Sequence, residues 1–143
     1  MTDAAWFFPL FSVLSQASTA NMVAKYVGEE TRNGTPVQHI RFAAHFAGAD
    51  AASASLLASL TTEDVYLDSA SLLPVAISFN AHADSDALTN IAVEIDFSNY
   101  QVVSGARVPF KIQKLLNSGP FLDIDVQSVT VNSGLSDSTF AIQ

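Results

Sequence analysis

Three stretches in the second half of the chain decide the fold: Val93-Glu94-Ile95-Asp96-Phe97, Arg107-Val108-Pro109-Phe110-Lys111-Ile112-Gln113 and Leu122-Asp123-Ile124-Asp125-Val126. In each stretch apolar residues alternate with polar ones, and a period of two is typical of a β-strand with one buried face. The polar positions are acidic in the first stretch, basic in the second and acidic in the third, so neighbouring strands would place unlike charges opposite each other. The three stretches are therefore predicted to pair in sequence order, as an antiparallel meander.

The same alternation predicts four more strands, at residues 21–30, 37–44, 64–68 and 75–79, with a polar loop at residues 80–90. The first two flank Asn33-Gly34, a dipeptide that favours a two-residue hairpin because both residues tolerate positive φ. The last five strands would share one apolar face, formed by Val65 and Leu67; Val75, Ile77 and Phe79; Val93, Ile95 and Phe97; Val108, Phe110 and Ile112; Leu122, Ile124 and Val126.

Two helices are predicted from different signals. Near the N-terminus apolar residues recur at helical spacing, and Pro9 fits this pattern only in the first turn of a helix, so the helix is predicted over residues 9–17. The aromatic residues before it would form an anchoring arm. The second helix is predicted over residues 50–60, which are rich in Ala and Leu and begin with Asp50, a favoured N-cap residue.

These elements predict the architecture. A sheet of seven or eight strands twists strongly, so it must curl, and its apolar concave side must be filled. The sequence therefore predicts an α+β fold, a curved antiparallel β-sheet that forms an incomplete barrel, with one or two helices covering the concave apolar face. Residues 1–143 are expected to form a single half-barrel domain, or the C-terminal part of a longer native chain.

Composition restricts the possible functions. Of the 143 residues 49% are apolar and 14% are charged, whereas about 25% are charged in a typical globular protein. The net charge is −8, and no two of the six basic residues are adjacent, which disfavours nucleic-acid binding. No stretch approaches the ~18 apolar residues of a membrane-spanning helix. Cysteine is absent, which excludes disulfides, thiolate catalysis and cysteine-based zinc sites.

The candidate metal ligands are few. His39, His45 and His82 do not have the spacing of ligands on one strand face, and they are interpreted as surface or loop histidines. Asp84 and Asp86 supply two carboxylates, fewer than a calcium loop needs. No metal site and no cofactor are therefore predicted.

Candidate catalytic groups are equally sparse. The sequence contains no Gly-x-Ser-x-Gly elbow and no glycine-rich phosphate loop. Four strand carboxylates are interpreted as a solvated face that complements basic neighbours, without a pocket that raises a pKa: Glu94, Asp96, Asp123 and Asp125. The chain is therefore predicted not to be an enzyme.

Three groups of motifs carry a resemblance to a known family. They are Tyr66-Leu67-Asp68 with Leu73-Pro74-Val75; Phe97-Ser98-Asn99-Tyr100 with Gly105 and Val108-Pro109-Phe110-Lys111-Ile112; and Val131-Asn132-Ser133-Gly134-Leu135 with Asp137-Ser138-Thr139-Phe140. In this order they resemble the closing strands of the LolA-like superfamily of periplasmic lipoprotein carriers. The resemblance implies an incomplete antiparallel barrel with helices across its opening, a hydrophobic cavity for lipid acyl chains, and a periplasmic location. The arginine that such carriers use in helix closure has no identifiable counterpart here.

Two functions follow as hypotheses. The first is a periplasmic binding or carrier domain that holds a lipid or a lipoprotein acyl chain between sheet and helices, its native signal sequence having been removed. The second is a structural or protein-interaction domain of the cell envelope with a filled core and no ligand. In the first, the apolar cavity is expected to be lined by Trp6, Phe7, Leu10, Phe11, Phe79, Phe97 and Phe110.

Overall fold

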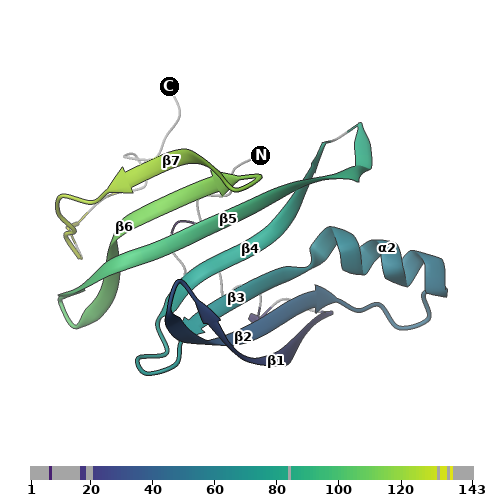
Figure 1. Cartoon of the computed structure of the whole chain (residues 1–143), viewed down its shortest axis with the longest axis horizontal. Coiled ribbons are helices and arrows are strands. Elements are labelled where there is room, and N and C mark those ends of the chain that lie inside the picture. The colour runs from purple at the N-terminus through teal and green to yellow at the C-terminus, as the bar shows by residue number, and fades with distance from the viewer. Residues whose placement is uncertain are drawn as a thin grey trace.

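The computed structural model of the chain describes residues 7, 17–18, 21–83, 85–131, 133–134 and 136. Seven strands form one antiparallel sheet in which each strand pairs with its neighbours in the sequence (Figure 1). The strands are β1 (Met22–Arg32), β2 (Thr35–Ala44), β3 (Glu63–Asp68), β4 (Pro74–Ala83), β5 (Asp86–Val103), β6 (Ala106–Leu116) and β7 (Gly119–Asp125), and the helix α2 (Ala51–Thr61) separates β2 from β3. The predicted α+β class and the open, curved antiparallel sheet are confirmed.

Short turns set this topology. Asn33 and Gly34 join β1 to β2 with φ angles of 49° and 81°, the left-handed conformation that a two-residue hairpin requires at both positions. Ser104 and Gly105 join β5 to β6 in the same way. Asn117 and Ser118, between β6 and β7, also have positive φ. The first of these three connections, Asn33-Gly34, was predicted as a two-residue hairpin.

The main core lies on one face of the sheet. Its buried members come from five strands, and the predicted alternation placed most of them inward: Phe42, Val65, Ile77, Val93, Ile95, Phe97 and Ile112. Each is at most 5% exposed. At about 1.5–3 kcal/mol for each fully buried aliphatic or Phe side chain, this cluster provides much of the free energy that drives the sheet to form.

Three details of the strand pattern differ from the prediction. The polar loop expected at residues 80–90 is mostly strand, because β4 continues to Ala83 and β5 begins at Asp86, whose carboxylate accepts hydrogen bonds from the backbone of Leu88 and Thr89. Val75 packs with the opposite face, because the register between β3 and β4 shifts at this point. Leu122 is 40% exposed, because β7 is an edge strand.

The helix α2 begins as predicted. The carboxylate of Asp50 accepts hydrogen bonds from the backbone N–H groups of Ala52 and Ser53, 3.0 Å each, which satisfies donors that have no partner in the first turn. Figure 1 shows the helix at one end of the sheet, where it contacts β2 and β4, and none of its residues is fully buried. The other predicted helix, at residues 9–17, lies outside the described residues except for Ala17. In the part of the chain that the structure describes, no helix is long and apolar enough to cross a membrane.

Candidate functional site

The candidate site is the apolar face of the sheet, where side chains of neighbouring strands align in rows that cross the strands. The longest row runs from β2 to β7 through residues that are directly opposite one another in the register: Ile40, Val65, Ile77, Ile95, Lys114 and Leu122. A second row runs from β2 to β6: Phe42, Glu63, Phe79, Val93 and Leu116. Neighbouring strands lie about 4.8 Å apart, so the longer row offers a continuous apolar surface roughly 19 Å long between Ile40 and Lys114.

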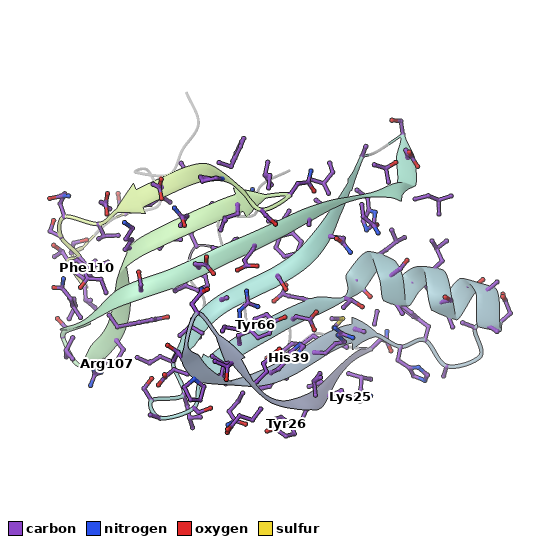
Figure 2. All side chains as sticks on the ribbon, viewed as in Figure 1. Lys25, Tyr26, His39, Tyr66, Arg107 and Phe110 are labelled. Carbon is purple, nitrogen blue, oxygen red and sulfur yellow. The ribbon has the colours of Figure 1, made fainter. Side chains whose placement is uncertain are left out.

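The structure brings together three of the residues predicted to line the cavity. Phe97 is buried in the core of this face, and Phe79 is half-buried and packs against the same cluster. Phe7, which belongs to neither the sheet nor α2, also packs there. Phe110 is half-buried on β6 outside this cluster, and Figure 2 shows it at the end of the sheet opposite α2. The remaining three predicted lining residues, Trp6, Leu10 and Phe11, lie outside the described residues.

Two ionisable side chains share this face. Glu63 is only 4% exposed and Lys114 only 6%. Glu63 stands between Phe42 and Phe79 in the shorter row, and Lys114 stands between Ile95 and Leu122 in the longer row. The sequence pattern predicted an apolar face. The structure shows that this face also carries these two ionisable side chains. The period of two would have identified both, because Glu63 precedes Val65 by two positions and Lys114 follows Ile112 by two.

The cavities differ in character between the two faces. At the α2 end of the apolar face a cavity of about 240 Å³ opens between the helix and the sheet, lined by Met22, Leu60, Thr61, Thr62, Glu63, Phe79 and Asn80. A larger hollow, of about 410 Å³, has polar walls that include Asp64, Ser78, Asn80 and Glu94, and these residues suit water better than an acyl chain. The space suited to an apolar ligand is therefore the smaller cavity and the apolar face that continues from it.

The opposite face carries an ion cluster around His39. This imidazole is 8% exposed and lies beside the ring of Tyr66, with 4.5 Å between the ring centroids (Figure 2). Its Nδ1 lies 2.9 Å from a Glu30 carboxylate oxygen, and its Nε2 lies 2.8 Å from an Asp64 carboxylate oxygen. His39 therefore lies between two carboxylates that come from different strands, Glu30 on β1 and Asp64 on β3. His39 was predicted to be a surface or loop histidine, and that prediction is wrong because its ring is buried among Glu30, Asp64 and Tyr66.

Asp64 joins this cluster to a second basic group, Arg41. Arg41 donates from Nε and from one terminal nitrogen to the two carboxylate oxygens of Asp64, at 2.7 and 2.9 Å. Burial by itself would raise the pKa of Asp64, but the hydrogen bonds from Arg41 and then His39 outweigh it and hold that pKa below its usual value. The carboxylate is therefore ionised at neutral pH and holds two neighbouring strands together through their side chains.

A second group of charges attaches the hairpin tip to the middle of the sheet. Arg32, the last residue of β1, donates to the Glu94 carboxylate on β5 at 2.5 Å, and its guanidinium lies 3.9 Å above the ring of Tyr66. Asp96 lies two residues beyond Glu94 on the same strand face. Burial, followed by the charge of Glu94 and a hydrogen bond with it, raises the pKa of Asp96 to about 6.

This arrangement corrects two predictions about the polar face. The predicted complement of Glu94 and Asp96 was the basic strand β6, but Leu115 and Gln113 lie opposite them, and Glu94 pairs instead with Arg32 of β1. The face was also expected to hold no group with a raised pKa, and Asp96 has one. The predicted charge pairing does hold at Lys111, which lies directly opposite Asp125. Within the described residues no three His, Cys, Asp or Glu side chains form a group that suits a metal ion.

Comparison with known proteins identifies the fold. No protein-family model matches the sequence, and no curated protein matches it. Among solved structures, the chain is similar to an outer membrane lipoprotein-sorting protein domain from Vibrio parahaemolyticus, with a TM-score of 0.57 and 15% identity over 84% of this chain and 46% of that one. It is also similar to a LolA superfamily protein from Nitrosomonas europaea, with a TM-score of 0.45 and 11% identity over 87% of this chain and 50% of that one. The chain thus has a LolA-like fold and spans about half the length of these two structures.

Proposed function

We propose that this chain is a non-catalytic binding or carrier domain for an apolar ligand, such as a lipid or the acyl chains of a lipoprotein, and that it acts in the periplasm. The observation that carries the proposal is the apolar face, which presents a continuous row of aliphatic side chains across the sheet and accepts Phe7 from outside the sheet. A LolA-like fold supports it, because one similar solved structure is described as a lipoprotein-sorting domain.

In this proposal the ligand takes the place of Phe7 on the core face. The cavity beside α2 has about 240 Å³, whereas sites for small molecules usually enclose about 300–1,000 Å³. A ligand therefore needs more space than this cavity gives, and it gains that space when Phe7 leaves the core face. Phe79 and Phe97 would then contact the ligand on the sheet side, and Trp6, Phe7, Leu10, Phe11 and Phe110 remain predicted lining residues.

The proposal assigns no reaction to the charged groups. On the polar face Asp64 is held by Arg41 and His39, and Glu94 is held by Arg32. Carboxylates that are engaged in this way stabilise strand contacts and are poorly placed to transfer protons to a substrate. The ion cluster is therefore assigned a structural role.

A second candidate is supported by the density of the core. Val65, Ile77 and Ile95 are 0% exposed, which is what an envelope domain with a permanently filled interior would also show. On this alternative the domain would act through its outer surface, and Phe7 would be a fixed part of the core.

Binding of a fluorescent fatty acid to the delipidated protein distinguishes the two candidates. Saturable binding, weakened by Phe79→Ala and unaffected by Phe46→Ala, is the expected result, because Phe79 lines the cavity whereas Phe46 is 43% exposed in the segment after β2. An absence of saturable binding to the folded wild-type protein would leave the filled envelope domain as the better description.

A further inference from the structure

The outer edge of β1 is a long strand edge with exposed apolar side chains. β1 has 11 residues and stands at one end of the strand order, and no other described strand pairs with its outer side. Val23, Tyr26 and Val27 are 52%, 60% and 48% exposed, and Figure 2 shows Lys25 and Tyr26 at this margin of the sheet. Free backbone N–H and C=O groups beside apolar side chains are a template for a further strand. The edge is therefore suited to pairing with another chain.

The charges of β1 indicate which chain fits this edge. Lys25 lies directly opposite a like charge, Arg41 of β2, and like charges in this position are destabilising. Arg41 is paired with Asp64, and none of the ion pairs among the described residues includes Lys25. The side chain of Glu30, five residues further along β1, is 45% exposed although one of its oxygens contacts His39. Five residues of a strand span roughly 16 Å, so β1 carries both halves of an ion pair that it cannot form within itself.

The bulge in β1 brings Lys25 and Glu30 onto the same face of the sheet. In a regular strand, residues five apart point to opposite faces. The register with β2 shifts in the middle of β1, so that Lys25 lies opposite Arg41 and Glu30 opposite Val37, two residues of β2 that are four apart and share a face. Residues directly opposite each other in an antiparallel pair must point to the same face. The bulge therefore makes it possible for Lys25 of one copy to lie opposite Glu30 of another.

We propose that the outer edge of β1 pairs with β1 of a second copy of this chain, antiparallel, about a two-fold axis perpendicular to the sheet. In the register with the axis between Val27 and Gly28, Lys25 lies opposite the partner's Glu30, and the symmetry forms this ion pair twice. No two like charges of β1 are opposed in this register. The axis leaves both apolar faces on the same side, so the dimer has one continuous sheet with a doubled apolar face. This inference concerns assembly, and it goes beyond the proposed function without depending on it.

The other edge of the sheet is less suited to self-pairing. β7 contains Pro120, which has no backbone N–H to donate to a further strand. Its exposed carboxylates, Asp123 and Asp125, would bring the acidic residues of two copies close together. Pairing of β1 with β7 of a second copy would leave a free edge at each end and continue as an open filament, whereas pairing of β1 with itself closes as a dimer.

Sedimentation velocity of the full chain at increasing protein concentration tests this assembly. A single pair of strands is a small interface, so the wild type is expected to pass from monomer to dimer in the micromolar range. Lys25→Glu and Glu30→Lys each place like charges opposite each other at both symmetric positions. Each substitution should therefore raise the dissociation constant of the dimer by about tenfold or more.

An equimolar mixture of the two variants provides the sharpest result. In a dimer with one copy of each, both symmetric positions again have unlike charges opposite each other, so the mixture should form dimers about as tightly as the wild type. A change in the fold of either variant cannot produce this recovery. General attraction cannot produce it either, because each substitution changes the net charge of −8 by two and both variants stay negative. A mixture of two folded variants that remains monomeric would overturn the proposed pairing.

The matched control is Arg107→Glu. Arg107 is exposed on β6, Figure 2 shows it well away from Lys25, and its replacement changes the net charge by the same amount as Lys25→Glu. The dimer should persist in this control. A wild type that stays monomeric throughout, or a control that weakens the dimer as much as Lys25→Glu does, would contradict the proposal. If circular dichroism shows that Glu30→Lys is unfolded, the comparison of Lys25→Glu with Arg107→Glu decides the question.

Discussion

Replacing Asp96 by Asn should stabilise the protein, and by more at pH 8 than at pH 5. Asp96 is half-buried on β5, and burial, the charge of Glu94 and a hydrogen bond with it raise its pKa to about 6. In the unfolded chain the same carboxyl titrates near its ordinary pKa of about 3.9. The folded state therefore binds this proton more tightly than the unfolded state does. Asn keeps the shape and a donor for Glu94, but it is neutral at every pH.

The sign and the size of the effect follow from linkage. Between about pH 4 and pH 6 the folded state holds the proton that the unfolded state has lost, so the free energy of unfolding falls as the pH rises. Above pH 6 the carboxyl is ionised in both states, so the free energy of unfolding no longer changes with pH through this group. A shift of about two pKa units corresponds to about 3 kcal/mol, and solvent screening of a half-exposed group reduces this to about 1 kcal/mol. The gain from Asp96→Asn at pH 5 should be about half the gain at pH 8, because pH 5 lies midway between the two pKa values.

Urea unfolding, monitored by intrinsic fluorescence, measures the free energy of unfolding of the wild type and the variant at both pH values. The matched control is Asp123→Asn, because Asp123 is exposed on β7 and accepts a hydrogen bond from Gln113 that Asn can also accept. The control should change stability by a few tenths of a kcal/mol, equally at both pH values. A gain for Asp96→Asn that does not depend on pH, or a loss of stability at pH 8, would refute the account of this carboxyl.

Substitutions at three other positions test separate parts of the fold by the same unfolding measurement. Ile77→Ala should lower the free energy of unfolding by about 2–5 kcal/mol, because Ile77 is 0% exposed at the centre of the core, and a cost below about 1 kcal/mol would contradict that placement. Asp50→Ala should cost about 1 kcal/mol through the lost N-cap, and Asp50→Ser, which retains a cap, should cost less. Arg32→Met should cost about 1–3 kcal/mol because it leaves Glu94 without its ion pair, and no cost would show that the hairpin tip is not held there.

The sequence predicted those features of the fold that depend on neighbouring residues. Alternation placed Val93, Ile95 and Phe97 in the core, and Asn33-Gly34 specified the first hairpin. These signals are local, since a strand face is defined by every second residue and a tight turn by its two central residues. Because each connection in the sheet except that through α2 is a short turn, local signals were enough to determine the order of the strands.

The ion cluster was not predictable in this way because it depends on contacts that are distant in the sequence. Arg32 and Glu94 are 62 residues apart and meet only because the β1–β2 hairpin bends over the polar face of the sheet. The register shift near Gly28 in β1 contributes to this bend, since a bulge increases the local twist of a strand. Periodicity gave no information on which side chains from other strands cover His39.

The ion pairs of the polar face hold the β1–β2 hairpin against the sheet. On the polar face, side chains from β1, β2, β3 and β5 bind the hairpin to the sheet through Glu30, His39, Asp64, Arg32 and Glu94. From the apolar face, Phe42, Ile40 and Met22 of the same two strands pack into the main core, so both faces hold the hairpin. Under the proposed function, the polar-face contacts are the ones that would still hold these strands while a ligand replaces Phe7 on the apolar face.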